Sequence, residues 1–224
     1  MTISVNRKSG SAEKPARREG EIKPPRNRSK ALVTKSTRNG REVAVKDFTR
    51  CSAVLKRLYG RPTLRREVRA YGLLQGIEGI PQCFGLEGPD SMVIEYVHGR
   101  LLGDFKRGNI ESHVFDRVDG IVAAAHARGV AFGDLHESNI IITGSGDVFL
   151  IDFANAVFTG TPHRPGLFAR FFMNLDRHAA ARMRARYLRL PRPVPAGVFG
   201  FLYRFGRGLK AARGRIKKVL HAGR

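Results

Sequence analysis

The 224-residue chain has no tryptophan, only two cysteines and no long hydrophobic run. Cys51 and Cys83 share no spacing motif, which argues against a thiolate metal site and indicates buried or unreactive thiols in a reducing compartment. No stretch of about 18 uncharged apolar residues occurs, so no segment is expected to span a membrane. The first residues, MTISVNRKSG, also lack the apolar run of a secretory signal. These absences favour a cytoplasmic protein.

Acidic residues are also scarce, and the resulting charge is unevenly distributed. The formal net charge is +22 and the pI is near 11.2. Residues 1–30 hold nine basic and three acidic residues, whereas residues 177–224 hold fourteen basic residues and no acid. Residues 31–176 hold eighteen and sixteen, which is typical of a near-neutral globular domain. The excess predicts a polyanionic partner: nucleic acid, an anionic membrane face or a phosphorylated substrate.

The first half of the chain predicts a basic arm followed by two hairpins and a helix. Residues 1–30 are rich in Lys, Arg, Pro, Ser and Gly, which is typical of disorder. β-rich segments on both sides of Arg38-Asn39-Gly40 predict one hairpin, and PQCFGLEGPDSMVIEYV predicts another with its turn at Gly88-Pro89-Asp90. Between them, apolar spacing in residues 63–75 predicts a helix with Thr63 as its N-cap.

The second half predicts three helices around a β-rich centre. Residues 111–128 have a helical apolar face, and a turn is expected at 143–147 between two β-rich runs. Residues 174–190 predict an Arg-rich helix capped by Asn174. Residues 198–220 predict a basic amphipathic helix, which four glycines weaken. Its apolar side would pack on the domain or enter a membrane interface, or its arginines would bind RNA, and all three interpretations stay open.

Two short motifs in the second half of the chain hold the candidate catalytic residues. The motifs G-D-L-H-E-S-N at 133–139 and I-D-F at 151–153 supply an Asp, an Asn five residues later, and a second Asp after a β-rich stretch. Such an arrangement serves phosphoryl transfer. Asp134 would orient the attacking hydroxyl and accept its proton, while Asn139 and Asp152 would hold Mg²⁺. An acid directly after an apolar run, as Asp152 is, is costly to bury without a partner or a metal.

With this constellation, the sequence resembles the protein-kinase-like superfamily. The motif V-A-V-K at 43–46 is similar to the third-strand motif of that family, which implies that Lys46 contacts the α- and β-phosphates of ATP. Glu67 is placed like the helix glutamate that pairs with this lysine. The resemblance runs from about Ala31 to Ala154. It implies an α+β, two-lobed fold with a reduced helical C-lobe.

The resemblance also implies the remaining nucleotide contacts. MVIEYVHGR at 92–100 resembles the hinge, where the backbone of Glu95 and Val97 would hold adenine. The glycine-rich loop of the family is missing, so Ser29 and nearby backbone amides would cradle the phosphates instead. The expected divisions are a basic arm (1–30), an N-lobe (31–97), a reduced C-lobe with the catalytic and metal-binding loops (98–190) and a basic amphipathic segment (191–224).

Several departures point away from typical protein kinases. Gly133 replaces the arginine that often precedes the catalytic Asp, Ala154 replaces the glycine of D-F-G, and no A-P-E motif follows. His136 stands where many protein kinases have a lysine; it would donate to the γ-phosphate or serve as a structural hydrogen-bonding residue. G-D-L-H-x-x-N is more similar to kinases of small molecules and sugars, and to lipopolysaccharide core kinases. Residues 171–187 also loosely resemble the Arg-rich helix that closes the Kdo and heptose kinases.

The sequence therefore predicts a phosphotransferase that uses ATP and Mg²⁺ and moves the γ-phosphate to a hydroxyl acceptor. The preferred acceptor is a sugar of a lipopolysaccharide-type glycolipid at the inner membrane face, where a cytoplasmic enzyme would act as a peripheral protein. One alternative is an atypical, RIO-like Ser/Thr protein kinase. An alternative of another class is a pseudokinase that binds a membrane or, less favoured, RNA.

Overall fold

The structure is a computed structural model that describes residues 21–23, 31–159, 165–194 and 200. Apart from residue 200, the basic amphipathic helix expected at 198–220 lies outside these residues, as do the cradle residue Ser29 and most of the arm at 1–30. Within the described ranges, no helix combines the length and the apolar character needed to cross a bilayer.

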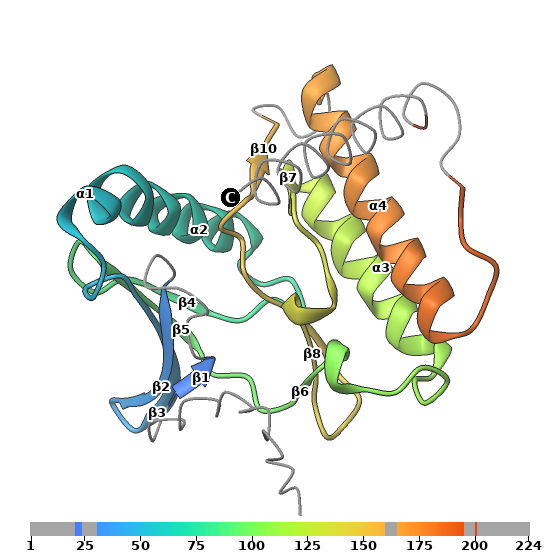
Figure 1. Cartoon of the computed structure of the whole chain (residues 1–224), viewed down its shortest axis with the longest axis horizontal. Coiled ribbons are helices and arrows are strands. Elements are labelled where there is room, and N and C mark those ends of the chain that lie inside the picture. Colours follow the sequence, from blue (N-terminus) through green and yellow to red (C-terminus); the bar gives the residue numbers. More distant parts are fainter. Residues whose placement is uncertain (1–20, 24–30, 160–164, 195–199, 201–224) are drawn as a thin grey trace, which may run out of the picture.

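A five-stranded antiparallel sheet forms one side of the molecule (Figure 1). Its order is β1-β2-β3-β5-β4, so both predicted hairpins are present and pair with each other through β3 and β5. Residues alternate between the two faces of β3, which places Val43 and Val45 on one face and Lys46 on the other. The strands are β1 (Glu21–Lys23), β2 (Leu32–Arg38), β3 (Arg41–Asp47), β4 (Cys83–Leu86) and β5 (Ser91–Glu95).

The first helix starts earlier than predicted. A continuous helical segment comprises α1 (Ala53–Leu55), a π-helical turn (Lys56–Gly60) and α2 (Arg61–Leu74). Ser52 is its N-cap and accepts a hydrogen bond from the Leu55 N–H at 3.4 Å. The prediction that Thr63 caps the helix is therefore wrong, since Thr63 is buried inside it. Pro62 has no N–H to donate to an earlier carbonyl. The π-helical turn directly before α2 lets the helical segment continue past this missing hydrogen bond, so no new helix begins at Pro62.

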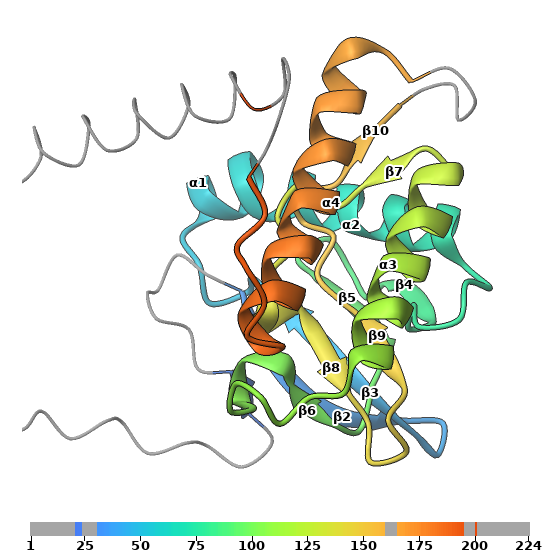
Figure 2. The ribbon, with the colours of Figure 1, turned by 90° about the vertical axis from the view of Figure 1, so that its right-hand side faces the viewer.

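Two long helices, α3 (Ser112–Ala127) and α4 (Leu167–Tyr187), pack side by side on the other side of the molecule (Figures 1 and 2). The predicted apolar face of α3 is buried. The prediction that Asn174 caps the next helix is wrong, because α4 begins seven residues earlier, after Gly166. Ala169 and Met173 are buried at helical spacing, so packing of this extra turn outweighs the preference of asparagine for a cap.

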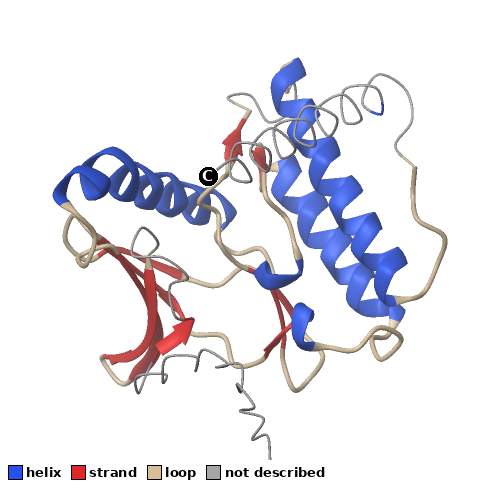
Figure 3. Cartoon of the chain, viewed as in Figure 1, coloured by secondary structure: helices blue, strands red, loops and turns tan. Residues whose placement is uncertain are grey.

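Short strands and turns connect these helices to the sheet (Figure 3). One three-stranded sheet has the order β6-β8-β9, with the expected turn at 143–147 between β8 and β9, and β7 pairs with β10. The strands are β6 (Arg100–Leu101), β7 (Val130–Ala131), β8 (Ile140–Ile142), β9 (Val148–Leu150) and β10 (Val157–Phe158); the 3₁₀ turns are Leu102–Asp104 and Glu137–Asn139. One hydrophobic core includes residues of α2, β5, α3, β8, β9 and α4. This core packs β8 and β9 against helices from both sides of the molecule, and so fixes the polar segments that flank these two strands.

Candidate active site

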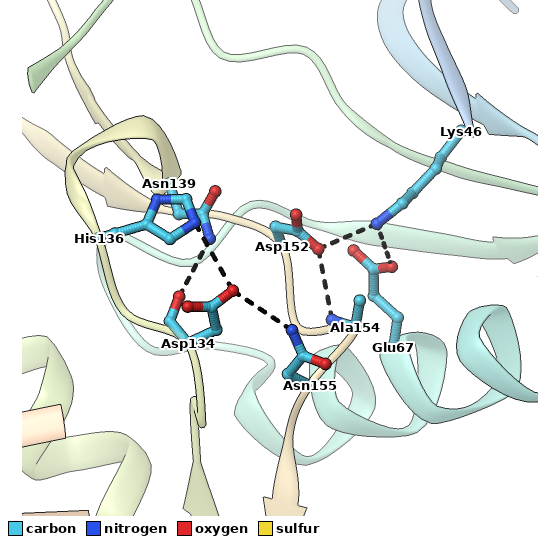
Figure 4. Close-up of polar contacts among 8 residues, drawn as sticks. All are labelled: Lys46, Glu67, Asp134, His136, Asn139, Asp152, Ala154 and Asn155. Atoms are coloured by element: carbon cyan, nitrogen blue, oxygen red, sulfur yellow. Dashed lines mark hydrogen bonds and ion pairs between the residues drawn. The ribbon is translucent and has the colours of Figure 1, made fainter. Parts of the chain in front are cut away.

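Three charged side chains from three separate elements meet beside β3 (Figure 4). Lys46 lies on β3, Glu67 lies on α2, and Asp152 follows β9. The Lys46 Nζ atom is 2.6 Å from Glu67 Oε2 and 3.0 Å from Asp152 Oδ1. The contact between Lys46 and Glu67 is the one that the resemblance implied, and the contact with Asp152 joins residues 106 positions apart. One ammonium group therefore connects the sheet, the helix and the segment after β9.

Burial and charge oppose each other in this cluster. The side chain of Glu67 is only 2% exposed and that of Lys46 is 16% exposed. Burial lowers the pKa of Lys46, but the negative charges and hydrogen bonds of Glu67 and Asp152 outweigh that effect and raise the pKa overall. Burial also raises the pKa of Glu67, against the opposing effect of Lys46. Lys46 thus remains a cation at neutral pH and faces two carboxylates.

The backbone around Asp152 is held in an unusual conformation. Asp152 has a φ of 70°, a region that residues other than glycine seldom occupy. The next residue, Phe153, is fully buried between the rings of Tyr71 and Phe132, with centroids 4.7 and 5.0 Å away. The Ala154 N–H also donates to Asp152 Oδ1 at 3.4 Å. Aromatic packing thereby fixes the segment and directs the carboxylate toward Lys46.

Asp134 lies on the neighbouring loop, and its carboxylate is 60% exposed. The Asn155 Nδ2 group donates to Asp134 Oδ2 at 3.4 Å, which ties this loop to the segment that carries Asp152 (Figure 4). His136 Nε2 lies 3.7 Å from the same oxygen, while His136 Nδ1 accepts from the Ser138 N–H at 3.3 Å. Because Nδ1 is the acceptor, a neutral His136 ring carries its proton on Nε2, on the side of Asp134.

The predicted metal ligands, Asn139 and Asp152, come from adjacent segments. The Ile151 N–H donates to the Asn139 carbonyl at 2.9 Å, which brings the two segments together. Asn139 is 5% exposed, and its Nδ2 donates to the Asp134 carbonyl at 3.3 Å, so its amide oxygen is the end left for another partner. A carboxylate and an amide oxygen are hard donors of the kind that Mg²⁺ prefers, together with retained waters. The donor set fits magnesium, and within the described ranges no cluster of three or more His, Cys, Asp or Glu side chains offers a different metal site.

Asp176 on α4 is a buried residue that sequence reasoning missed. Its carboxylate, 1% exposed, accepts from the Phe132 N–H at 2.7 Å and the Gly133 N–H at 3.1 Å. His126 Nε2 lies 3.0 Å from the same group. These contacts hold the backbone immediately before Asp134. The signal was present in the sequence: Asp176 is the last acid of the chain, and it shares helical spacing with Met173 and other buried residues of α4.

The structure explains why position 133 is a glycine. Its φ is +74°, and a Cβ atom there would lie 2.3 Å from the Asn155 carbonyl oxygen. Any side chain would therefore separate the Asp134 loop from the segment after Asp152. The arginine found at this position in many protein kinases is incompatible with the close approach of these two backbones. Asn155, which the sequence analysis also missed, is the residue on the other side of that approach.

The predicted hinge residues lie between β5 and β6. Glu95 ends β5 and is opposite Val43 in the register with β3, and Val97 is half-buried two residues later. The Glu95 N–H donates to the Gln82 carbonyl at 2.7 Å, and the Glu95 side chain accepts from the Gln82 N–H at 3.0 Å. This pairing fixes the end of β5. The roles assigned to the backbone of Glu95 and Val97 stay predictions.

Comparisons with known proteins give partial matches. No protein-family model matches the chain. The chain is 30% identical over 156 residues to a probable SapB synthase of Streptomyces coelicolor and 28% identical over 147 residues to CBL-interacting protein kinase 16 of Oryza sativa subsp. japonica. The matches cover 54% and 62% of this chain but only 16% and 32% of those proteins. The chain thus corresponds to less than a third of the length of each relative.

A solved structure establishes the fold. The Rio2 kinase of Chaetomium thermophilum, crystallised as an ADP/Mg²⁺-phosphoaspartate complex, aligns with a TM-score of 0.56 at 14% identity. The alignment covers 76% of this chain and 56% of that one. At such identity the likeness concerns the fold alone. The mixed arrangement of sheets and helices is accordingly a protein-kinase-like fold, which confirms the coarse fold prediction.

Proposed function

We propose that this chain is an ATP-dependent phosphotransferase that transfers the γ-phosphate to a hydroxyl acceptor. The observation that carries the proposal is the contact of Lys46 with both Glu67 and Asp152, beside a loop that presents an exposed Asp134. A cation on the central strand of a sheet, held by a buried acid, suits the α- and β-phosphates of a nucleotide. The kinase-like fold and the weak similarity to a plant protein kinase support the same class.

Each polar residue of the site has a role in this proposal. Lys46 binds the phosphates, Glu67 holds Lys46 in place, and the backbone of Glu95 and Val97 holds adenine. Ser29, with nearby backbone amides, cradles the phosphates. The proposed boundary between the two lobes lies near residue 97, between the five-stranded sheet with α2 and the part that contains α3 and α4.

Asn139 and Asp152 would hold Mg²⁺ through their side-chain oxygens. Bound there, the ion supplies positive charge that offsets the negative charge of the phosphates. The chain's own contribution is to hold these oxygens in adjacent segments and to keep Lys46 between two carboxylates. The same Lys46 contact prevents Asp152 from rotating freely before the nucleotide binds.

Asp134 would orient the acceptor hydroxyl and accept its proton on a carboxylate oxygen. Its exposure suits this role, because the acceptor must reach it from solvent. Asn155 donates to Oδ2, which leaves Oδ1 for the hydroxyl. His136 carries its ring proton near Asp134, so it is placed either to donate to the γ-phosphate or to orient the carboxylate.

For the acceptor, we favour a sugar hydroxyl of a lipopolysaccharide-type glycolipid, with the enzyme peripheral on an anionic membrane. The G-D-L-H-x-x-N motif and the Arg-rich α4 support this choice. The likeness to Rio2 kinase supports a protein acceptor, as in an atypical Ser/Thr kinase, equally well. The two acceptor classes differ in one accessible property, which is whether phosphate from ATP appears in lipid or in protein.

The test is label transfer from γ-labelled ATP with Mg²⁺ by the purified chain, offered glycolipid, soluble sugar or protein acceptors. We expect label in the glycolipid fraction, and no label when Mg²⁺ is chelated. Label in protein alone would favour the RIO-like alternative. Retained nucleotide binding without label in any acceptor would identify a pseudokinase and overturn the proposal.

A further inference from the structure

A pocket lies at the carboxyl end of α4, beside the loop that carries Asp134. Its volume is about 410 Å³, which is large enough for a phosphorylated monosaccharide. Four of the side chains that line it are arginines and only one is an acid. The lining residues are Arg107, Glu137, Arg182, Met183, Ala185, Arg186, Leu190 and Arg192.

The charges in this pocket are unbalanced, whereas those on the adjoining face of α4 are balanced. Arg184 pairs with Asp116 and Asp119 of α3, so one guanidinium faces two carboxylates. The pocket lining has four arginines but one acid, Glu137, and its carboxylate contacts Arg186 at 2.6 Å. The pocket therefore keeps a net positive charge, and the pairing of Arg184 shows that this surplus is not a general property of the helix.

His178, one turn before Arg182 on α4, lies within reach of two of these arginine charges. Its pKa is lowered, first by burial and then by the charges of Arg182 and Arg192. Both arginines therefore act on the same region, although Arg192 lies beyond the end of α4. A pocket lined by several guanidinium groups suits a phosphate, whose oxygens accept bidentate hydrogen bonds.

The pocket is built on fixed backbone contacts. The Gly108 N–H donates to the Tyr187 carbonyl at 2.8 Å, and Arg189 Nη2 donates to the Arg107 carbonyl at 3.3 Å. The Leu190 N–H donates to the Ala185 carbonyl at 2.9 Å. These bonds hold the loop that carries Arg107 against the last turn of α4. Arg107 and Arg192 therefore line one pocket, and the backbone that carries Arg107 is already held before a ligand binds.

The pocket is connected to the proposed site through Glu137. This residue lies three positions after Asp134 and in the same 3₁₀ turn as Asn139, and its carboxylate binds Arg186. A ligand held by the arginines would thus be next to the loop that presents the acceptor to Asp134. Met183 and Ala185 are buried, and Leu190 adds an exposed apolar side chain, which suits the carbon skeleton of a sugar.

We propose that this arginine pocket binds a phosphate group that the acceptor already carries, so that the acceptor is a phosphorylated sugar, either soluble or in a lipid headgroup. The inference rests on the proposed function, because it assigns the pocket to the acceptor. A single concave site suits one phosphorylated sugar better than a nucleic-acid backbone, which requires a series of cations along a strand.

The first experiment measures binding by the full chain without ATP. N-acetylglucosamine 1-phosphate is compared with N-acetylglucosamine by calorimetry, and phosphatidylcholine vesicles with and without diphosphoryl lipid A are compared by flotation. The test variant is Arg107→Gln/Arg192→Gln, and the matched control is Arg65→Gln/Arg66→Gln, which removes the same charge from exposed positions on α2. We expect the pocket variant to bind the phosphorylated probe about tenfold or more weakly and the control to bind like the wild type. Binding to the soluble sugar phosphate or only to the vesicles identifies the source of the phosphate group.

Several outcomes would overturn the inference. Equal losses in the pocket and control variants would mean that net charge, not the pocket, binds the probe. Equal affinity for the phosphorylated and unphosphorylated sugars, or a 20-nucleotide RNA that displaces the probe with a steep salt dependence, would also contradict it. The charge-retaining variant Arg107→Lys/Arg192→Lys should retain more binding than the glutamine variant. Nucleotide binding and label transfer are measured separately, so a pocket that binds phosphate in a chain without transfer would refute the proposed function alone.

Discussion

Two buried carboxylates, Glu67 and Asp176, organise opposite sides of the candidate site in different ways. Each residue is 1% exposed. Glu67 is opposed by a single cation, Lys46, which also contacts Asp152. Asp176 accepts from two backbone N–H groups and contacts His126. The first carboxylate is bound mainly by one lysine side chain, with a further hydrogen bond from the Phe153 backbone, whereas the second is bound chiefly by the backbone that it positions.

The difference indicates which side of the site can adjust. Lys46 can redistribute its hydrogen bonds between Glu67 and Asp152 without moving the backbone, so the nucleotide side tolerates rearrangement when phosphates arrive. Asp176 uses both of its oxygens on donors from the segment before Asp134. The loop that would carry the general base is consequently fixed before any ligand binds. Four substitutions test this contrast.

The largest effect is expected for Asp134→Asn. The exposed carboxylate contributes little to folding, but loss of a general base should reduce turnover by about 10²-fold or more. Nucleotide affinity and the melting temperature should stay near the wild-type values. Initial rates of label transfer, together with a thermal melt, check this. Asp152→Asn serves as the contrasting variant, since it should weaken Mg²⁺-dependent nucleotide binding; wild-type rates in both variants would refute the assigned roles.

The next effect concerns stability and is expected for Asp176→Asn. The substitution removes the charged acceptor of two buried N–H groups and places an amide donor among them, at a cost of about 3 kcal/mol. For a chain of this size, that corresponds to a decrease in melting temperature of about 6–12 °C. Thermal and urea unfolding check the prediction, with Asp116→Asn on the exposed face of α3 as the control. A decrease no larger than that of the control would mean that Asp176 is not an anchor.

Asp134 and Asp176 also show what a sequence can and cannot predict. Asp134 stands in a recognisable motif, because its proposed chemistry requires particular neighbours at fixed spacing. Asp176 acts on backbone groups about 43 positions away, and backbone groups leave no pattern in the sequence. We therefore expected the Arg-rich helix but did not recognise the acid on its buried side. Gly133 is a similar case, since its close approach to Asn155 depends on two segments meeting in space.

The secondary structure was predicted well where local patterns dominate. Both hairpins and α3 are present as expected, because alternation, turn residues and helical spacing are local signals. The starts of the other two helices were misplaced at Thr63 and Asn174. In both cases a residue that is favourable at a cap lies inside a helix: α4 buries Ala169 and Met173 in the turns before Asn174, whereas the segment before Thr63 begins at the better-placed cap Ser52. Capping preference is a weak signal when apolar burial competes with it.

A smaller effect on stability is expected for Glu67→Gln. Because burial raises the pKa of Glu67, its charged form is held at a cost, and a neutral side chain of the same shape avoids that cost. Because Asp152 still neutralises the partly buried Lys46, we expect the free energy of unfolding to fall by only about 1 kcal/mol, less than the loss from an uncompensated buried charge. Turnover should fall because Lys46 then pairs with Asp152 alone. Urea unfolding beside Asp176→Asn checks this. If both variants lose the same stability, the two carboxylates are equivalent and the contrast fails.

The smallest effect is expected at Asp90, a carboxylate with no assigned role in the chemistry that pairs with Arg61 at 2.8 Å and with Lys56 at 3.6 Å. The hydrogen bond from Arg61 is the main reason why the pKa of Asp90 lies below its usual value of 3.8. A lowered folded pKa means that the pair stabilises the fold above the unfolded pKa and loses this contribution as the pH falls through the folded pKa. The melting temperature of Asp90→Asn should therefore be slightly below that of the wild type at neutral pH and should converge with it well below pH 3.8. At neutral pH the deficit of Asp176→Asn should be larger than that of Asp90→Asn, since an asparagine there keeps one acceptor oxygen and faces the second buried N–H group with an NH₂ donor. A deficit for Asp90→Asn that persists unchanged at the lowest pH would show that packing, not the ion pair, explains its effect.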